Sequence, residues 1–140
     1  HAIRLARLLS EATPNIGFDV RDALELSRED GADLLVCMEV LEHLSEPARL
    51  LDRMADIAPK YALFSVPNEP LWRVLNLLRG RYWRRLGNTP GHEQHWTSKR
   101  FRRFVMRRFE IVEVRRPIPW TMILAQPRSA GGTSAQPNGR

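Results

Sequence analysis

The chain has 140 residues, the size of a single domain, and its 43% hydrophobic and 27% charged content is that of an ordinary globular protein rather than a disordered one. The 22 basic residues exceed the 16 acidic ones, but the arginines are spread along the chain, so we attribute them to genome base composition rather than to a nucleic-acid-binding surface. The single Cys37 cannot form an intramolecular disulfide, and no apolar run approaches the ~20 residues that span a bilayer, so we expect a cytoplasmic protein without a signal peptide or transmembrane segment.

The first elements are a helix and a strand. Residues 2–12 place apolar side chains at helical spacing, which predicts an amphipathic helix ended by Thr13-Pro14. Residues 15–21 alternate apolar and polar side chains, which predicts a strand ending at Asp22-Ala23. The polar residues 27–32 are interpreted as a loop.

The most informative stretch begins with the apolar run 33–38, which is typical of a strand buried on both faces. Three polar residues follow it at once: Glu39, Glu42 and His43. Polar groups at the end of a buried strand indicate a site at the carboxyl edge of a parallel sheet. An equally good interpretation is that Glu42 and His43 only begin the next helix.

A helix is predicted after Ser45-Glu46-Pro47, with Ser45 as its N-cap, and it ends before Pro59. Residues 60–66 form the next apolar run and are predicted to be a strand. Strand, helix and strand joined by short loops predict a parallel α/β sheet.

The second half begins with a helix predicted over residues 70–86, whose later part mixes arginines with aromatic side chains. We interpret this part as a lid or an extra packed helix rather than a nucleic-acid or membrane contact. Ser98 is predicted to cap a further helix running to Arg108. The arginines of that helix are expected to form a solvated face, and they are Arg100, Arg102, Arg103 and Arg107.

The last elements are two strands, over residues 109–115 and 120–125, joined by a short connection that contains prolines. They predict an antiparallel pair. In the first of them, strict alternation would put Val112 and Val114 on one side and Ile111 with Glu113 on the other. The Gly-, Ser- and Pro-rich residues 129–140 predict a disordered tail.

In this order, four pieces of sequence resemble class I S-adenosylmethionine-dependent methyltransferases, in particular the broad bacterial group similar to quinone-biosynthesis methylases. They are Asp22-Ala23, the stretch from Asp33 to Leu44, Val66-Pro67-Asn68 and the final hairpin. The resemblance covers roughly residues 1–126 and implies a Rossmann-like sheet, mostly parallel, with strand order 3-2-1-4-5-7-6 and strand 7 antiparallel.

The strands of this chain would then be numbers 3 to 7 of the family. No Gly-x-Gly occurs in the chain, so the glycine-rich loop after strand 1 is absent, and so is the acidic residue that ends strand 2. We therefore expect residues 1–128 to be a partial methyltransferase domain, truncated at the N-terminus, with a helical insert at 69–91.

The resemblance also implies the residues that hold the cofactor, S-adenosyl-L-methionine. Asp22 would accept a hydrogen bond from the adenine amino group, with the Ala23 backbone beside it. Met38, Glu39 and Val40 would lie along the methionine part of the cofactor. The alternative for Asp22 is an ordinary turn or helix cap.

Two histidines are candidates for catalysis, because an imidazole accepts a proton near neutral pH. His43 or His95 would serve as the general base for a hydroxyl or carbon acid. A second hypothesis is a divalent metal of the Mg or Mn type, held by Glu39, Glu42 and His43 on one helical turn. Resemblance to metal-dependent relatives would add His92 or His95 as a further ligand, with His95 the better placed. The simpler interpretation is that Glu42 and His43 fix the turn.

The sequence thus predicts methyl transfer to a small-molecule, lipid-linked or glycan acceptor, as part of a longer enzyme. A degenerate or truncated binding module without catalysis is one alternative. A metal-assisted RNA 2′-O-methyltransferase is the other, so nucleic acid is the less favoured partner.

Overall fold

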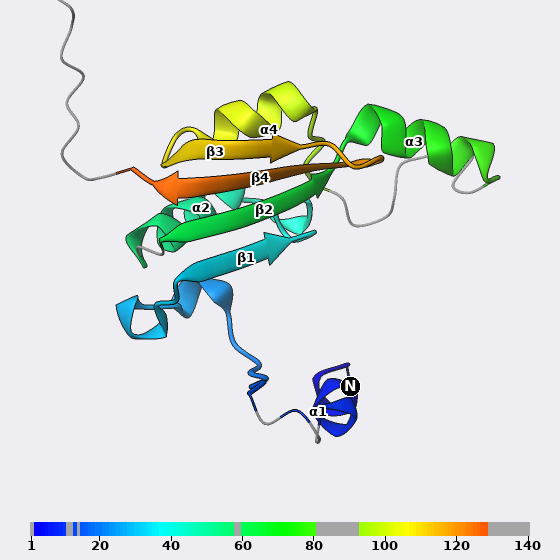
Figure 1. Ribbon diagram of the computed structural model, residues 1–140. Coiled ribbons are helices and arrows are strands. Elements are labelled where there is room, and N and C mark those ends of the chain that lie inside the picture. The colour runs from blue at the N-terminus through cyan, green and yellow to red at the C-terminus, as the bar shows by residue number, and fades with distance from the viewer. Residues whose placement is uncertain (1, 11–12, 14, 58–59, 81–92, 129–140) are drawn as a thin grey trace, which may run out of the picture.

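The computed structural model describes residues 2–10, 13, 15–57, 60–80 and 93–128. Its body is one four-stranded sheet with the strand order β1-β2-β4-β3 (Figure 1). The strands are β1 (Leu34–Met38), β2 (Tyr61–Pro67), β3 (Phe109–Arg115) and β4 (Trp120–Pro127).

The strand directions confirm the predicted topology. β1 and β2 are parallel, with Met38 opposite Ser65 at their carboxyl ends, and β4 is antiparallel to both of its neighbours. β1, β2 and β3 therefore point the same way, and only β4 is reversed (Figure 1). This is the order expected for strands 4, 5, 7 and 6 of the family that the sequence resembles.

One face of the sheet is covered by helices α2 (Pro47–Asp56) and α4 (Ser98–Val105). The hydrophobic core lies between them and the strands, where alternate residues such as Phe64 and Phe109 point inward and are fully buried. Their rings meet edge to face with centroids 5.1 Å apart. Replacing either ring by alanine would cost about 3–5 kcal/mol, so this contact fixes how β2 and β3 pack beneath the helices.

The opposite face of β1 is open among the described residues. Leu34, Val36 and Met38 remain 47%, 56% and 46% exposed, although they are apolar. The prediction that this strand is buried on both faces is therefore wrong for the described chain. β1 is also an edge strand of the sheet, and among the described residues β2 is the one strand that pairs with it.

The predicted N-terminal helix is present as α1 (Ala2–Leu9), which stands apart from the sheet in Figure 1. The predicted strand at residues 15–21 is wrong, because this segment is extended but forms no strand. A strand needs a neighbour to take its backbone hydrogen bonds, and the expected family order puts two further strands between this segment and β1. The Phe18 carbonyl accepts instead from the Arg7 guanidinium, at 2.7 Å.

The ends of several helices differ from the predicted ones, because the residue that caps a helix depends on the local backbone conformation as well as on the residue type. Glu46 rather than Ser45 is the N-cap of α2, and it makes no side-chain cap bond. Thr97 rather than Ser98 caps α4, accepting from the Arg100 amide at 3.2 Å, and α4 ends at Val105 rather than at Arg108. α3 (Glu69–Leu78) confirms a helix after β2, but it ends at Leu78 rather than running to residue 86, and residues 79–80 form a turn.

β3 contains an irregularity that alternation does not predict. Its register shifts between Ile111 and Glu113, and after the bulge Val114 packs against the core while Val112 is exposed. The predicted sharing of one side by Val112 and Val114 is therefore wrong.

The rest of the predicted insert at 81–91 and the tail at 129–140 lie outside the described residues. No helix among the described residues is long and apolar enough to cross a membrane.

Candidate functional site

The site is built at the carboxyl ends of β1 and β2, where the chain leaves the sheet. The Ser65 hydroxyl donates a 2.7 Å hydrogen bond to the Glu39 carboxylate, and the Glu39 amide donates to the Ser65 carbonyl at 3.1 Å. Glu39 has a φ of 56°, a left-handed conformation that is strained for a residue with a side chain. The two bonds to Ser65 hold this strained turn, which directs the following residues away from the strand.

The chain then forms the 3₁₀ turn η3 (Leu41–His43). Glu42 is fully buried in it, whereas His43 is exposed. The Glu42 carbonyl accepts from the amides of Glu93 and Gln94 at 2.9 and 3.0 Å. These bonds connect the segment that precedes α4 to the turn that follows β1, so residues from both halves of the chain meet at this edge of the sheet.

A cavity of about 240 Å³ lies beside this turn. It brings together Asp22 and Ala23 from one side and Val40 from the other, which are three of the five residues predicted to hold the cofactor. The remaining lining residues are Leu24, Leu44, Ser45, Glu46, Arg49 and Leu50. Of the other two predicted residues, Met38 lies half-exposed on the open sheet face and Glu39 is held by Ser65.

Asp22 also has the capping role that the alternative interpretation gave it. Its Oδ1 accepts from the Leu24 amide at 2.9 Å, which caps the 3₁₀ turn η1 (Ala23–Glu25). Because Oδ1 caps the turn while the side chain remains exposed, the same carboxylate keeps a second oxygen for a ligand. The two interpretations of Asp22 are therefore compatible.

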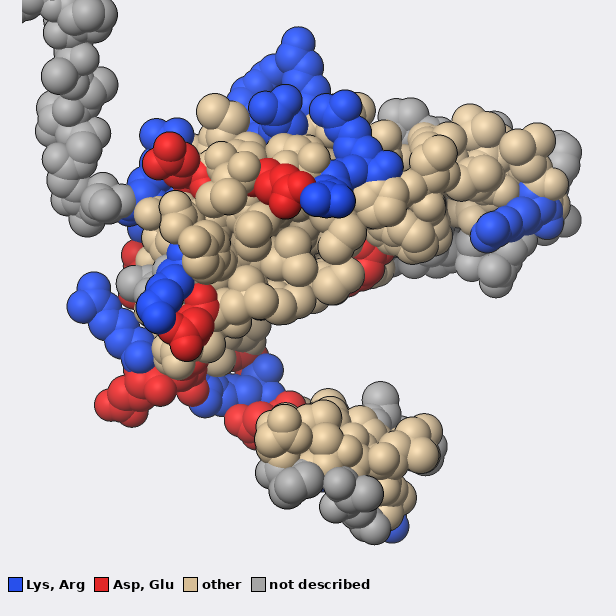
Figure 2. Space-filling view, viewed as in Figure 1, with Lys and Arg blue, Asp and Glu red and all other residues tan. Residues whose placement is uncertain are grey.

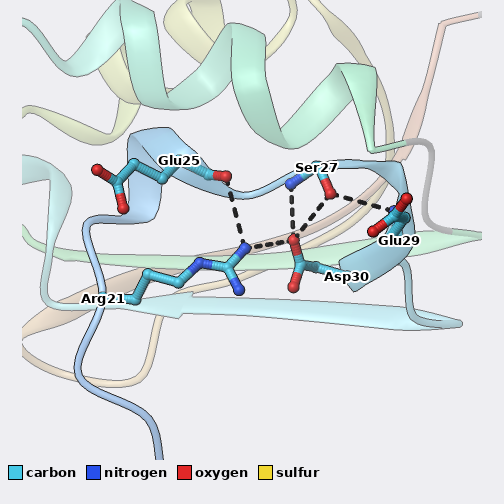
Figure 3. A network of polar contacts seen from close by, with 5 residues as sticks. All are labelled: Arg21, Glu25, Ser27, Glu29 and Asp30. Atoms are coloured by element: carbon cyan, nitrogen blue, oxygen red, sulfur yellow. Dashed lines mark hydrogen bonds and ion pairs between the residues drawn. The ribbon is translucent and has the colours of Figure 1, made fainter.

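A polar network fixes the loop that carries Asp22 and Ala23 (Figure 3). Asp30, at the end of η2 (Arg28–Asp30), accepts from the Ser27 amide at 2.8 Å and from the Arg21 guanidinium. The bond from Arg21, with help from Ser27, lowers the pKa of Asp30 from 3.8 to about 2. The loop predicted at 27–32 is thus a capped turn, and it anchors the residues directly before the cavity.

Beneath the site, Cys37 is a buried structural thiol. It is 6% exposed in the core, and burial, with the charge of Glu42 nearby, raises the pKa of its thiol to about 12. The thiolate form needed for nucleophilic chemistry is therefore strongly disfavoured.

A pair that sequence reasoning missed lies at the end of β2. Glu69 begins α3 with its side chain buried, and its Oε2 lies 3.5 Å from Nδ1 of the half-exposed His95. The Glu69 amide donates to the Trp96 carbonyl at 3.0 Å, which places His95 beside the helix start. A glutamate directly after Val66-Pro67-Asn68 was the available signal, since the site was already expected at strand ends.

The predicted metal ligands are not brought together. Among the described residues, no group of three or more His, Cys, Asp or Glu side chains is arranged to hold a metal ion. The reason is local: Glu42 points into the interior, His43 is exposed, and the Glu39 carboxylate is bonded to Ser65. His95 pairs with Glu69 instead of joining them.

The cavity suits a flat apolar ring that carries a hydrogen-bond donor. Leu24, Val40 and Leu50 supply apolar walls, and Asp22 supplies an acceptor at the rim. Its volume of about 240 Å³ is below the ~300–1,000 Å³ of sites that enclose whole drug-sized ligands, so it can hold one ring system rather than a whole cofactor.

Comparisons with known proteins identify the family and the fold. A family model described as a methyltransferase domain matches residues 5–113. A search of curated proteins finds no match. Three solved structures share the fold: the PH0226 protein from Pyrococcus horikoshii OT3, magnesium protoporphyrin IX methyltransferase from Synechocystis PCC 6803, and N-methyltransferase NodS from Bradyrhizobium japonicum WM9.

Their TM-scores are 0.65, 0.63 and 0.62 and their sequence identities are 15%, 17% and 18%, in the same order. They cover 90%, 90% and 91% of this chain, and the last two contain S-adenosylhomocysteine. The chain spans only 66%, 59% and 62% of their lengths. Since the family model covers most of the chain and the strand order agrees, the chain belongs to the methyltransferase-domain family, with the Rossmann-like fold of class I methyltransferases.

Proposed function

We propose that this chain supplies the adenine-binding and acceptor-facing part of an S-adenosylmethionine-dependent methyltransferase that acts on a small-molecule, lipid-linked or glycan acceptor. The observation that carries the proposal is the cavity at the carboxyl end of β1, where Asp22, Ala23 and Val40 meet. Ligands of open α/β sheets bind at this edge of the sheet.

The cofactor, when bound, supplies an activated methyl group. The chain's own part is to hold the adenine between Ala23 and Val40 and to accept a hydrogen bond at Asp22. The strained turn at Glu39, which Ser65 holds, would fix the path of the chain beside the methyl-bearing end of the cofactor. Methyl transfer is an in-line displacement, so positioning of this kind is the main contribution that a protein can make.

On the acceptor side, His95 is the better placed of the two predicted bases. Glu69 contacts its Nδ1, so Nε2 is left to accept a proton from an acceptor hydroxyl. His43 is exposed and is the alternative base. A hydroxyl acceptor would need this general base, because its proton must leave the oxygen as the bond between that oxygen and the methyl carbon forms.

The test is calorimetric titration of the protein at its natural length with S-adenosylhomocysteine. Asp22→Ala is expected to weaken binding about tenfold or more, because a charge-assisted hydrogen bond contributes about 1.5–3 kcal/mol. Asp22→Asn retains an oxygen to cap the Leu24 amide, so an intermediate loss would separate charge from loop folding.

Asp33→Ala is the matched control. Asp33 is exposed and its 2.7 Å ion pair with Lys60 lies at the opposite end of β1, so binding should change less than twofold. If S-adenosylhomocysteine does not bind, or binds Asp22→Ala as well as the original chain, the proposal fails and a non-catalytic binding module becomes the better account.

A further inference from the structure

A second cavity, which we call the arginine groove, lies between the first turn of α2 and α4 and has a volume of about 680 Å³. Its lining includes four arginines, which are Arg49, Arg100, Arg103 and Arg107. Glu46 is the only acidic residue of that lining. The Lys and Arg side chains over α4 project from the upper edge of the molecule in Figure 2.

The charges of the groove are unbalanced. Glu46 pairs with Arg49 at 3.1 Å, which accounts for both groups. Arg100, Arg103 and Arg107 are exposed and form no ion pair with an acidic side chain among the described residues. Arg108, directly adjacent in sequence, contrasts with them because it bonds both Asp52 and Asp56, at 2.7 and 2.8 Å. Three positive charges are therefore left at the groove.

The spacing of these arginines places them on the same side of the groove. Positions 100, 103 and 107 lie on one face of α4 and of the turn that follows it, and they span about 10 Å along the axis. The first turn of α2 lines the same groove and adds the positive end of its dipole. Guanidinium groups bind phosphate oxygens in bidentate fashion, and three unpaired guanidinium groups suit a ligand that carries several negative charges, as a phosphate group does, more than a single carboxylate.

The size and floor of the groove favour a small ligand over a nucleic acid. Its volume falls within the ~300–1,000 Å³ typical of small-molecule sites. Trp96 and Phe104 form the floor, but they are 6% and 8% exposed and pack on each other with centroids 4.8 Å apart. Neither ring is open for base stacking, which is the usual sequence-tolerant contact of single-stranded nucleic acids.

From these observations we propose that the arginine groove binds the diphosphate group of a small ligand. Three guanidinium groups are enough to neutralise a diphosphate, which carries two negative charges as a diester and up to three as a monoester, and their span is longer than a single phosphate group. Arg49, Ser45 and Glu46 line both the arginine groove and the adenine-type cavity, so the ligand would lie next to that cavity. The sequence predicted only that the arginine face of α4 is solvated, and the proposal gives part of this face a role in binding.

The test uses the protein at its natural length and measures binding of inorganic pyrophosphate by calorimetry at fixed ionic strength. The groove variant is Arg100→Gln/Arg103→Gln/Arg107→Gln. The control variant is Arg53→Gln/Lys99→Gln/Arg102→Gln, which removes the same charge from α2 and α4 at exposed positions outside the groove. Thermal unfolding of both variants checks that the fold is retained.

We expect pyrophosphate to bind, the groove variant to weaken this binding by at least about tenfold, and the control variant to change it less than about threefold. Inorganic monophosphate should bind more weakly than pyrophosphate. Neutral phosphatidylcholine vesicles, with and without a diphosphate-bearing lipid, distinguish a lipid headgroup from a free diphosphate, because only the former recruits the protein to the vesicle.

Three results would overturn the proposal. The first is pyrophosphate binding that is absent or equal in the groove and control variants. The second is equal affinity for monophosphate and pyrophosphate. The third is tighter binding of a single-stranded RNA oligonucleotide than of pyrophosphate, with the RNA binding lost in the groove variant. That result would make the groove a nucleic-acid surface instead. None of these results depends on cofactor binding at Asp22.

Discussion

The Ser65 hydroxyl lies 2.7 Å from the Glu39 carboxylate, and this bond joins the ends of two parallel strands just where the backbone of Glu39 becomes left-handed. A strained conformation persists only where its surroundings hold it, and Ser65 is the side chain that does so here. The bond therefore links strand pairing to the geometry of the candidate site.

Replacing Ser65 by alanine removes the donor and leaves the Glu39 carboxylate part-buried without it. We expect the variant to lose about 1–3 kcal/mol of stability in urea unfolding and to bind S-adenosylhomocysteine several-fold more weakly. Ser98, on α4, accepts a 3.1 Å hydrogen bond from Arg116 away from the cavity, so Ser98→Ala should leave cofactor binding unchanged. Equal effects of the two variants on binding would contradict the role assigned to Ser65.

The contact between Glu69 and His95 predicts a defined tautomer. With Nδ1 of His95 3.5 Å from Glu69 Oε2, the neutral ring should carry its proton on Nδ1 and leave Nε2 free to accept. Long-range ¹⁵N NMR of the imidazole measures this directly. Glu69→Gln should shift the population toward the Nε2–H form, and a predominant Nε2–H form in the original protein would remove the argument for His95 as base.

Asp30 provides a pH-dependent contribution to folding. Its pKa is about 2 in the folded protein instead of 3.8, so its bond with Arg21 stabilises the fold above pH ~4 and is lost as the pH falls toward 2. A carboxyl ¹³C titration should place the Asp30 midpoint near 2, and Arg21→Gln should move it back toward 3.8. A midpoint near 3.8 in the original protein would show that the network in Figure 3 does not persist in solution.

Cys37 should resist thiol reagents while the protein is folded. With a pKa of about 12, only on the order of 10⁻⁴ of the thiol is ionised at pH 8, and the side chain is buried. Ellman's reagent is expected to react slowly in buffer and within seconds to minutes in concentrated urea. Rapid reaction in buffer would mean that β1 opens readily from the helix-covered face.

The sequence predicted the sheet where hydrophobic periodicity and chain order agree. β1 and β2 were found as short apolar runs of strand length bounded by polar or turn residues, and β3 was found from its alternation. The strand at 15–21 could not be judged from alternation alone, since pairing depends on a neighbour elsewhere in the sheet. The β3 bulge was missed for a similar reason, because one unpaired residue leaves no mark in composition.

The candidate site, like the fold, was predicted from the sequence only in part. The family resemblance put Asp22 and Ala23 at the adenine and Val40 at the methionine part of the cofactor, whereas all three line one cavity. Spacing along the chain suggested a metal turn at 39–43, but spacing does not say which side chain turns inward, and Glu42 does so. Glu69 was missed because its contact with His95 joins residues far apart in sequence.

The most direct test of the central claim is to observe where the adenine ring lies. Intermolecular nuclear Overhauser effects should connect the adenine H2 and H8 protons of bound S-adenosylhomocysteine with the methyl groups of Ala23 and Val40, which line the cavity. Contacts instead with Val36 on the open face of β1, or none to either cavity residue, would contradict the assignment of this edge as the cofactor site.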